Sequence, residues 1–256
     1  MNLAEQHYFA KLLDKASRDP APISQLSGSC DFSLSEAYEI QKLLVDQKLA
    51  RGEVLVGVKL GFTSRAKMLQ MGVGEIISGC LTDQMAVNNG GVVDFSEFIH
   101  PRIEPEIAFK LARGIEREVT RDEAFSMVEA VSPALEIIDS RYQNFKFSLE
   151  DVVADNSSSS RFVLGDWQSP DVDYSSLKMR MFVDGQEVAV GTTSEISGHP
   201  IESLVSLSRL ISHFNFTLRP GSIVLAGAAT AAIPLISNST IVNEVERLGS
   251  VSVRSE

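Results

Sequence analysis

Two carboxylates stand one residue apart in the stretch HPRIEPEIAFKL, residues 100–111. If this stretch is a β-strand, its side chains alternate between the two faces, and Glu104 and Glu106 share one face. The two side chains would then lie about 7 Å apart along the strand. Like charges at that separation repel each other, and burial increases the cost. The pair therefore needs either water or a cation to reconcile it.

A third carboxylate, Glu136, lies in the apolar stretch PALEIIDS, residues 133–140. A glutamate in a buried strand is rare unless it is paired or bound to a metal. Three carboxylates with no nearby histidine or cysteine suit a hard cation, Mg²⁺ or Mn²⁺, better than Zn²⁺. The alternative is a solvated strand edge, with Glu136 paired to Arg102 or Arg141. Spacing alone leaves both interpretations open.

Lys59 lies in VGVKLGFTS, residues 56–64, between apolar neighbours and with a glycine two residues away on each side. Glycines in a strand often mark the close approach of a ligand or of another backbone. A lysine inside such a strand would partner a carboxylate or an anionic substrate. The alternative is a lysine at a strand edge whose charged end reaches water. Asp83 and Asp155 follow apolar runs, and each could reach a pocket or cap a turn.

Other polar residues give weaker indications. His199 precedes a proline and a predicted helix, so we interpret it as a loop residue near a helix N-terminus. The serines at 157–160 are in no G-x-S-x-G motif, which disfavours a serine hydrolase.

The elements that must position these residues can be read from the periodicity. The first 50 residues are predicted to be helical, and Ser33 and Glu36 form a capping box. Asp184-Gly185 between two alternating runs indicates a hairpin. Strands are predicted at 54–62, 107–113, 134–140, 161–165, 178–191, 221–227 and 249–255, and further helices at 121–132 and 201–214. Helices followed by many short strands indicate an α+β fold, with a helical region at 1–52 and a catalytic unit at 53–256.

Composition limits the class of protein. The 256 residues carry a formal net charge of -11, which argues against nucleic acid and anionic membranes as partners. Cys30 and Cys80 are in no CxxC pattern, so we interpret them as reduced thiols. The first helix has acidic residues and no apolar signal core, and no apolar run approaches the length of a membrane span. We therefore expect a cytoplasmic protein.

Several ordered motifs resemble one family, the 2-oxopent-4-enoate hydratases and 4-oxalocrotonate decarboxylases of the fumarylacetoacetate hydrolase superfamily. The resemblance runs from about residue 34 to the C-terminus, whereas residues 1–33 match no motif of the family. Its motifs are GVKLGFTSRAKMLQMGV, HPRIEPEIAF, PALEIIDSRYQNFKFSLEDVVADNSSSSRFVLG, GHPIESLVSL and PGSIVLAGAATAAIPL. Two stretches, SRAKMLQMGV and SRYQNFKFSLEDVVADNSSSSRF, are more similar to the decarboxylases than to the hydratases.

The resemblance implies a fold and a set of functional residues. The fold would be a mixed, β-sandwich-like roll of the fumarylacetoacetate hydrolase C-terminal type, with an N-terminal helical region. The E-x-E and P-A-L-E motifs imply metal ligands, and the G-x-K motif implies a lysine near the substrate. The implied residues are Glu104, Glu106 and Glu136 for the metal, Lys59 and Asp83 for catalysis, and Lys59, Leu60, Asn156 and Ser157 for substrate binding.

The resemblance also implies an activity. The chain would use Mg²⁺ or Mn²⁺ to decarboxylate 2-oxohex-3-enedioate, a small dicarboxylate, to 2-hydroxypenta-2,4-dienoate in the meta-cleavage pathway of aromatic compound degradation. The alternative is hydration of 2-oxopent-4-enoate to 4-hydroxy-2-oxopentanoate, for which Asp83 is the candidate base. A non-catalytic scaffold need not retain three glutamates and a lysine, so their presence counts against that third reading. Association into an oligomer, and with the hydratase of the same pathway, is expected from the family.

Overall fold

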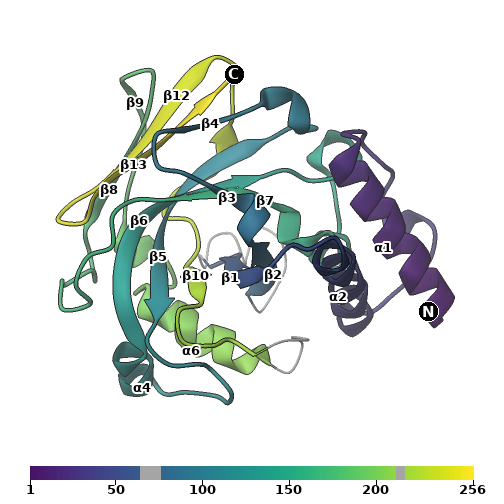
Figure 1. The fold of residues 1–256 in the computed structure, drawn as a ribbon, viewed down its shortest axis with the longest axis horizontal. Coiled ribbons are helices and arrows are strands. Elements are labelled where there is room, and N and C mark those ends of the chain that lie inside the picture. The colour runs from purple at the N-terminus through teal and green to yellow at the C-terminus, as the bar shows by residue number, and fades with distance from the viewer. Residues whose placement is uncertain (64–75, 212–216) are drawn as a thin grey trace.

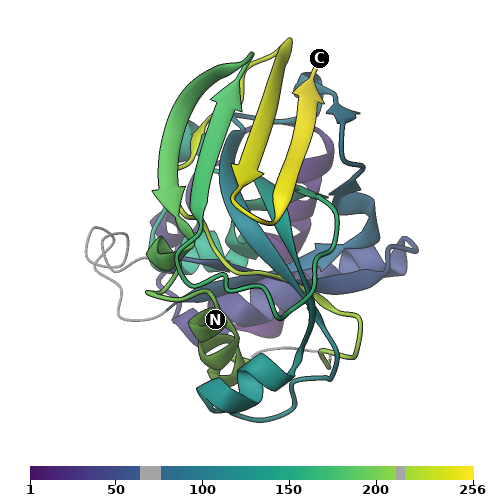
Figure 2. The same ribbon diagram turned by 90° about the vertical axis from the view of Figure 1, so that its left-hand side faces the viewer.

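Two β-sheets and a layer of N-terminal helices make up the protein, shown here as a computed structural model that describes residues 1–63, 76–211 and 217–256 (Figure 1). The larger sheet has the order β2-β1-β10-β5-β6-β7-β3, and β11 pairs with β5 beside this path. The smaller sheet has the order β4-β13-β12-β8-β9. Figure 2 looks onto the smaller sheet, which lies in front of the larger one.

The strands have the following bounds. In the larger sheet they are β1 (Leu55–Gly61), β2 (Ile77–Thr82), β3 (Ala86–Val87), β5 (Arg102–Leu111), β6 (Val128–Ile138), β7 (Ser159–Leu164), β10 (Ile223–Leu225) and β11 (Ile233–Pro234). In the smaller sheet they are β4 (Gly91–Val93), β8 (Lys178–Val183), β9 (Gln186–Thr192), β12 (Ser239–Val245) and β13 (Gly249–Ser255). Parallel pairs, such as β1 with β10, occur among mostly antiparallel ones, so the sheets are mixed as expected.

The helices gather on two sides of the larger sheet. The α-helices are α1 (Leu3–Arg18), α2 (Leu34–Ala50), α4 (Arg121–Ser126), α5 (Leu149–Ala154) and α6 (Ile201–Arg209). Short 3₁₀ turns are η1 (Leu26–Gly28), η2 (Asp83–Met85), η3 (Phe95–Glu97), η4 (Gln143–Phe145), η5 (Asn156–Ser158) and η6 (Thr193–Glu195). In Figure 1, α1 and α2 lie at the right, and α4 and α6 lie at the bottom. No helix in the described residues is long and apolar enough to span a membrane.

Local sequence explains the N-terminal helices. Ser33 accepts a hydrogen bond from the Glu36 N–H while Glu36 reaches back to Ser33, so the predicted capping box is confirmed. Leu13 of α1 and Ile40 of α2 pack with Val153 of α5 in one apolar cluster. The boundary between residues 52 and 53 stays a prediction.

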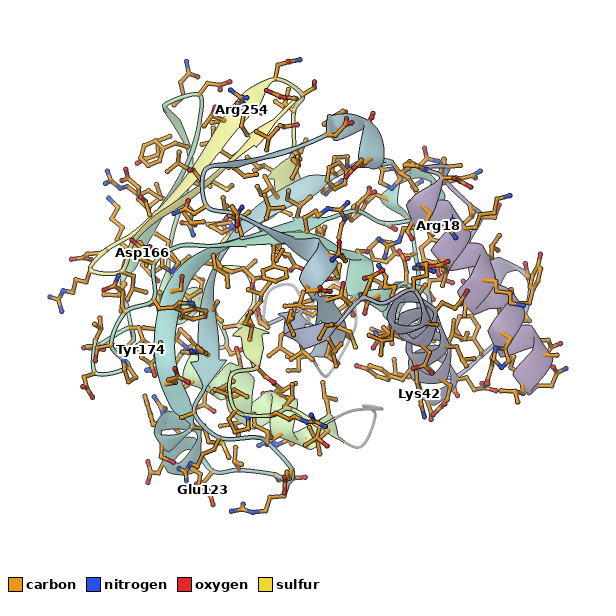
Figure 3. The ribbon with its side chains drawn as sticks, in the orientation of Figure 1. Arg18, Lys42, Glu123, Asp166, Tyr174 and Arg254 are labelled. Atoms are coloured by element: carbon orange, nitrogen blue, oxygen red, sulfur yellow. The ribbon has the colours of Figure 1, made fainter. Side chains whose placement is uncertain are left out.

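A core between the two sheets fixes which face of β5 receives the carboxylates. Ile103 of β5 and Ile137 of β6 pack against Ile241 of β12 and Val253 of β13. Side chains fill this space between the sheets (Figure 3). Because strand side chains alternate, Glu104 and Glu106 lie on the opposite face of the larger sheet, as predicted, and Glu136 lies on that face opposite Glu104.

Some predicted elements are confirmed and one is partly wrong. Asp184 and Gly185 have φ of 49° and 78° between β8 and β9, the left-handed geometry that a tight hairpin needs. The predicted helix 121–132 ends at Ser126, because Val128 and Val131 are buried in β6 and pair with β5. The last residues of the predicted helix 201–214 lie outside the described residues, as does the motif SRAKMLQMGV.

Candidate metal centre

Strand register brings the three predicted carboxylates together. β5 and β6 are antiparallel, and Glu104 lies directly opposite Glu136, so both side chains project from the same face. Glu106 follows two residues later on β5. One carboxylate oxygen from each residue lies within 4.8 Å of the other two, and all three residues are buried.

Lys59 of β1 joins this cluster. Its Nζ donates to Glu136 Oε2 at 2.9 Å, and both side chains are buried. Gly57 explains how β1 reaches this position, because a Cβ there would lie 1.9 Å from the Ile223 carbonyl oxygen of β10. The glycine thus marks the close approach of another backbone, one of the two possibilities raised by the sequence.

Burial and mutual repulsion shift the pKa values of the cluster. Burial, reinforced by Glu136 and Glu104, raises the pKa of Glu106 well above its usual range. Burial also raises the pKa of Glu136 to about 7, although Lys59 opposes this. Burial alone would lower the pKa of Lys59, but the three carboxylates outweigh it and the pKa is raised. The lysine is therefore charged at neutral pH, while the carboxylates lack enough positive charge around them.

One unsatisfied atom shows that these residues fit a cation. Glu106 Oε2 accepts from the Gly227 N–H at 2.8 Å, but its buried Oε1 has no hydrogen-bond partner among the described residues. A buried carboxylate oxygen without a donor is costly unless something else compensates it. Three converging carboxylates with no sulfur or imidazole among them are the donor set of Mg²⁺ or Mn²⁺.

A cavity of about 580 Å³ opens beside the cluster, a size suited to a small ligand. Its polar lining includes Lys59, Glu104, Arg102, Lys146, Ser157 and Ser158. Its apolar lining includes Phe62, Phe145, Phe147, Ile77 and Val152. The cavity therefore combines one carboxylate of the cluster, three basic side chains and apolar walls.

The predicted substrate-binding residues have different positions. Ser157 lines the cavity, and its Oγ donates to the Ser78 carbonyl at 2.8 Å. The Asn156 side chain does not line it, because it bonds both the N–H (2.7 Å) and the carbonyl (2.9 Å) of Cys80 and so ties η5 to β2. Leu60 is buried in the apolar core on the face of β1 opposite Lys59.

The structure does not bring Asp83 to this cavity. Asp83 begins η2, and its Oδ1 accepts from the Val54 N–H at 2.7 Å while its own N–H donates to the Val54 carbonyl. This bond with Val54 lowers the pKa of Asp83. These contacts match the interpretation of Asp83 as a turn cap and not as a residue near the substrate.

The alternative pairing of Glu136 with an arginine is wrong. Arg141 makes a buried ion pair with Asp155, and the Arg102 guanidinium lies 4.3 Å from the centre of the Phe145 ring. Sequence reasoning also missed Ser159, whose Oγ lies 3.4 Å from Glu136 Oε1. No sequence signal distinguishes Ser159 within its run of four serines.

Gly227 was missed as well. The sequence signal for it is a single glycine that directly follows the apolar run in VLAGAAT, residues 224–230. Its φ is +107°, and a Cβ there would lie 2.1 Å from Thr63 Oγ1. Only glycine fits, and this conformation directs the N–H at Glu106.

The protein is a two-sheet roll that carries, on one sheet, a buried cluster of three carboxylates able to hold a divalent cation. The chain belongs to the fumarylacetoacetate hydrolase family, since the family model described as Fumarylacetoacetate (FAA) hydrolase C-terminal matches residues 66–254.

Relatives agree with this assignment. A 4-oxalocrotonate decarboxylase from a Pseudomonas species is 49% identical over 243 residues, which cover 95% of each chain. A 2-keto-4-pentenoate hydratase from Paraburkholderia xenovorans (strain LB400) is 32% identical over 96% of this chain and 93% of its own. The structure of 4-oxalocrotonate decarboxylase from Pseudomonas putida G7, complexed with magnesium and adipate, superposes with a TM-score of 0.96 at 35% identity, covering 100% of this chain and 99% of that one.

Proposed function

We propose that this chain is a carboxy-lyase that converts 2-oxohex-3-enedioate to 2-hydroxypenta-2,4-dienoate and CO₂ with the help of Mg²⁺ or Mn²⁺. The observation that carries the proposal is the convergence of three buried carboxylates and Lys59 beside a cavity that Glu104 and Lys59 line. Similarity supports the choice of reaction, because the decarboxylase quoted above is 49% identical and the hydratase 32%.

The substrate is built to lose CO₂. Its C6 carboxyl is attached to C5, the saturated carbon next to a C3=C4 bond that is conjugated with the C2 carbonyl, so it is a vinylogous β-keto acid. When the C5–C6 bond breaks, its electron pair passes to the C2 oxygen, and protonation of that oxygen gives the dienol. A bound divalent cation supplies Lewis-acid stabilisation of negative charge on this oxygen.

Lys59 is the positively charged side chain within the carboxylate cluster. Its 2.9 Å ion pair with the buried Glu136 carboxylate favours the charged ammonium form, which acts as a hydrogen-bond donor rather than as a base. From its place beside Glu136 it can donate to the oxygen on which charge develops. Glu136 in turn fixes the direction of the ammonium group through the 2.9 Å bond.

Arg102 and Lys146 are suited to the far carboxylate of the substrate. Arg102 shares a face of β5 with Glu104 and lies two residues away, about 7 Å along the strand. That offset is on the scale of an extended six-carbon chain. We place the 2-oxo acid end at the carboxylate cluster and the C6 carboxylate toward Arg102. The Arg102 guanidinium stacks on the Phe145 ring, which holds it in position.

Hydration of 2-oxopent-4-enoate is the second candidate, since a hydratase is 32% identical to this chain over 96% of its length. It needs a base that positions water for attack at C4. Asp83, the base suggested by the family, is occupied with Val54 and does not line the cavity. The contacts of Asp83 therefore favour decarboxylation.

The setting of the reaction is also part of the proposal. We place the enzyme in the cytoplasm and in the meta-cleavage pathway of aromatic compounds. The dienol product is unstable, so an oligomeric enzyme that associates with the hydratase of the same pathway would pass the product on directly. Co-purification of the two enzymes, followed by sizing of the complex, tests this association.

Turnover of 2-oxohex-3-enedioate with Mg²⁺ and with EDTA tests the reaction, by following CO₂ release and dienol absorbance. Metal-dependent CO₂ release is the expected result. Metal-dependent consumption of 2-hydroxypenta-2,4-dienoate without CO₂ release would instead establish the hydratase.

A further inference from the structure

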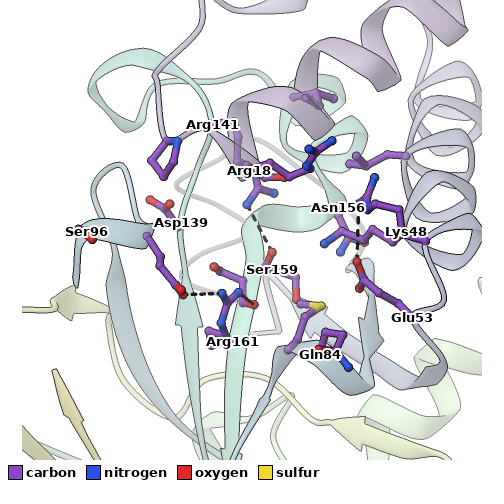
Figure 4. Close-up of a pocket in the computed structure, with 18 residues that line it drawn as sticks. Arg18, Lys48, Glu53, Gln84, Ser96, Asp139, Arg141, Asn156, Ser159 and Arg161 are labelled. Carbon is purple, nitrogen blue, oxygen red and sulfur yellow. Dashed lines mark hydrogen bonds and ion pairs between the residues drawn. The ribbon is translucent and has the colours of Figure 1, made fainter. Parts of the chain in front are cut away.

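A second cavity, of about 460 Å³, lies between the helices α1 and α2 and the larger sheet (Figure 4). Unusually for a chain with a net charge of -11, cationic side chains outnumber carboxylates in its lining. The cationic residues are Arg18, Lys48, Arg51, Arg141 and Arg161, and the acidic ones are Glu53, Glu97 and Asp139. Ser17, Ser96, Ser159 and Ser160 add hydroxyl groups.

The carboxylates of this second cavity are already engaged. Asp139 accepts from two backbone N–H groups, those of Ile99 and His100, at 2.9 and 2.8 Å. Glu53 accepts from Thr82 Oγ1 at 2.6 Å, and Glu97 accepts from Arg161 Nη2 at 2.8 Å. These bonds hold the acidic groups in place, and Glu97 and Glu53 each also lie within ion-pair distance of one cation of the cavity, Arg161 and Arg51 respectively.

Four of the five cations already pair with a carboxylate among the described residues, including Arg141 with Asp155 and Arg161 with Glu97, and Lys48 does not. Arg51 makes two bonds to Asp14, at 2.9 and 2.8 Å, which leaves Arg18 a distance of 3.8 Å from the same carboxylate. Lys48 is half-buried, and its ammonium group makes no hydrogen bond or ion pair with the described residues. Burial lowers the pKa of Lys48, and Glu53 offsets this only in part. A partly desolvated cation without a partner is costly, and a bound anion would remove that cost.

One wall separates this second cavity from the metal centre. Asn156 and Ser159 line the second cavity, whereas Ser157 and Ser158, between them in the chain, line the cavity of Lys59. Ser159 also lies 3.4 Å from Glu136 Oε1. The two cavities are therefore neighbours with separate linings, and basic side chains outnumber acidic ones in both.

We propose that the second cavity binds a small, multiply charged anion of the carboxylate or phosphate class, with Lys48, Arg18 and Arg161 as its cationic contacts. The ligand occupies this site independently of the substrate, because none of these three side chains lines the metal cavity. The inference does not depend on the reaction proposed above. Lys48 is its central residue, since binding gives its ammonium group a counter-ion in direct contact.

Calorimetric titration of the full-length, metal-free protein at constant ionic strength tests the inference, with inorganic phosphate in one arm and succinate in the other. The arm with the tighter binding identifies which of the two anion sources the site prefers. Lys48→Met removes the charge but keeps the apolar stem, and Arg18→Met removes an exposed contact. We expect one saturable site, weakened about tenfold by Lys48→Met, a loss of about 1.4 kcal/mol.

Two control variants make the result specific. Lys42→Met removes a lysine from the same helix, where it pairs with Glu39 at 3.8 Å, and should leave anion affinity unchanged. Arg102→Met removes a cation from the metal cavity and should also leave it unchanged. The inference is overturned if neither anion saturates below about 10 mM, if affinity is the same in Lys48→Met, or if Arg102→Met abolishes binding. Equal thermal midpoints of the lysine variants and the parent protein check that both fold.

Discussion

Replacement of Glu106 by glutamine should remove activity and at the same time stabilise the metal-free protein. Glutamine has the shape of glutamate, so its carbonyl oxygen can keep the hydrogen bond from the Gly227 N–H. Its amide group takes the place of Oε1, the oxygen that has no hydrogen-bond partner among the described residues. The substitution therefore removes one of three clustered negative charges with little change in packing.

The magnitude follows from the separation of the charges. Two unit charges 4.8 Å apart repel each other by about 3 kcal/mol at an effective dielectric constant of about 20. Glu106 has two such neighbours, but attraction to Lys59 and proton uptake by the cluster relieve part of the repulsion. We expect a net gain of about 1–3 kcal/mol, which raises the thermal midpoint by about 2–8 °C in a chain of this size.

Thermal unfolding in EDTA and in excess Mg²⁺ measures this effect. The parent protein should gain stability from Mg²⁺ by mass action, and Glu106→Gln should gain much less because a ligand is lost. Glu129→Gln is the matched control on β6, since Glu129 is exposed and pairs with Lys110 at 2.7 Å. A variant that unfolds below the parent in EDTA, or gains as much from Mg²⁺, would refute the assignment of Glu106.

Four further substitutions test other parts of the site and fold. Lys59→Met should abolish turnover but retain Mg²⁺ binding, and calorimetry that finds metal binding lost would contradict this role. Arg102→Met should raise the KM for the dicarboxylate at least tenfold, about 1.4 kcal/mol, without changing Mg²⁺ affinity; an unchanged KM would remove Arg102 from the substrate site. Asp83→Asn should reduce kcat less than tenfold, whereas a loss of several orders of magnitude would restore it as a catalytic base. Burial, followed by Arg121, lowers the pKa of His199, whose Nδ1 accepts from the Ile201 N–H at 3.1 Å. A lowered histidine pKa means that the unfolded state binds more protons, so the free energy of unfolding should rise as pH increases toward 6.5. His199→Asn can keep the hydrogen bond and should lose this rise, and urea unfolding between about pH 5 and 7.5 that gives parallel profiles would contradict the effect.

Charges inside apolar strands were the part of the site most open to prediction from sequence. Glu104, Glu106, Glu136 and Lys59 interrupt stretches that otherwise bury their side chains, and a buried charge needs a partner. Alternation along β5 also gave the correct faces. What the sequence does not contain is the register that places Glu136 opposite Glu104, because pairing between strands depends on the whole sheet.

Groups that act through the backbone or through long-range contacts were harder to predict. The Gly227 N–H has no side chain to identify it, and Asp83 looks the same whether it caps a turn or faces a substrate. The helix predicted over 121–132 failed for a related reason. Its second half has helical spacing, but burial of Val128 and Val131 against β5 favours a strand, and that contact is invisible to local periodicity.

Charge balance connects the metal centre with the basic residues at the cavity. Three carboxylates and one lysine leave two net negative charges in a buried site, which one divalent cation would neutralise. A dicarboxylate substrate then brings in two negative charges of its own, and burial makes these costly unless cations meet them. Arg102 and Lys146 stand in the lining where a second carboxylate would arrive, whereas a monocarboxylate would leave them without a partner. The distribution of charge in this cavity therefore favours the dicarboxylate over the shorter 2-oxo acid by a physical argument that is independent of sequence similarity.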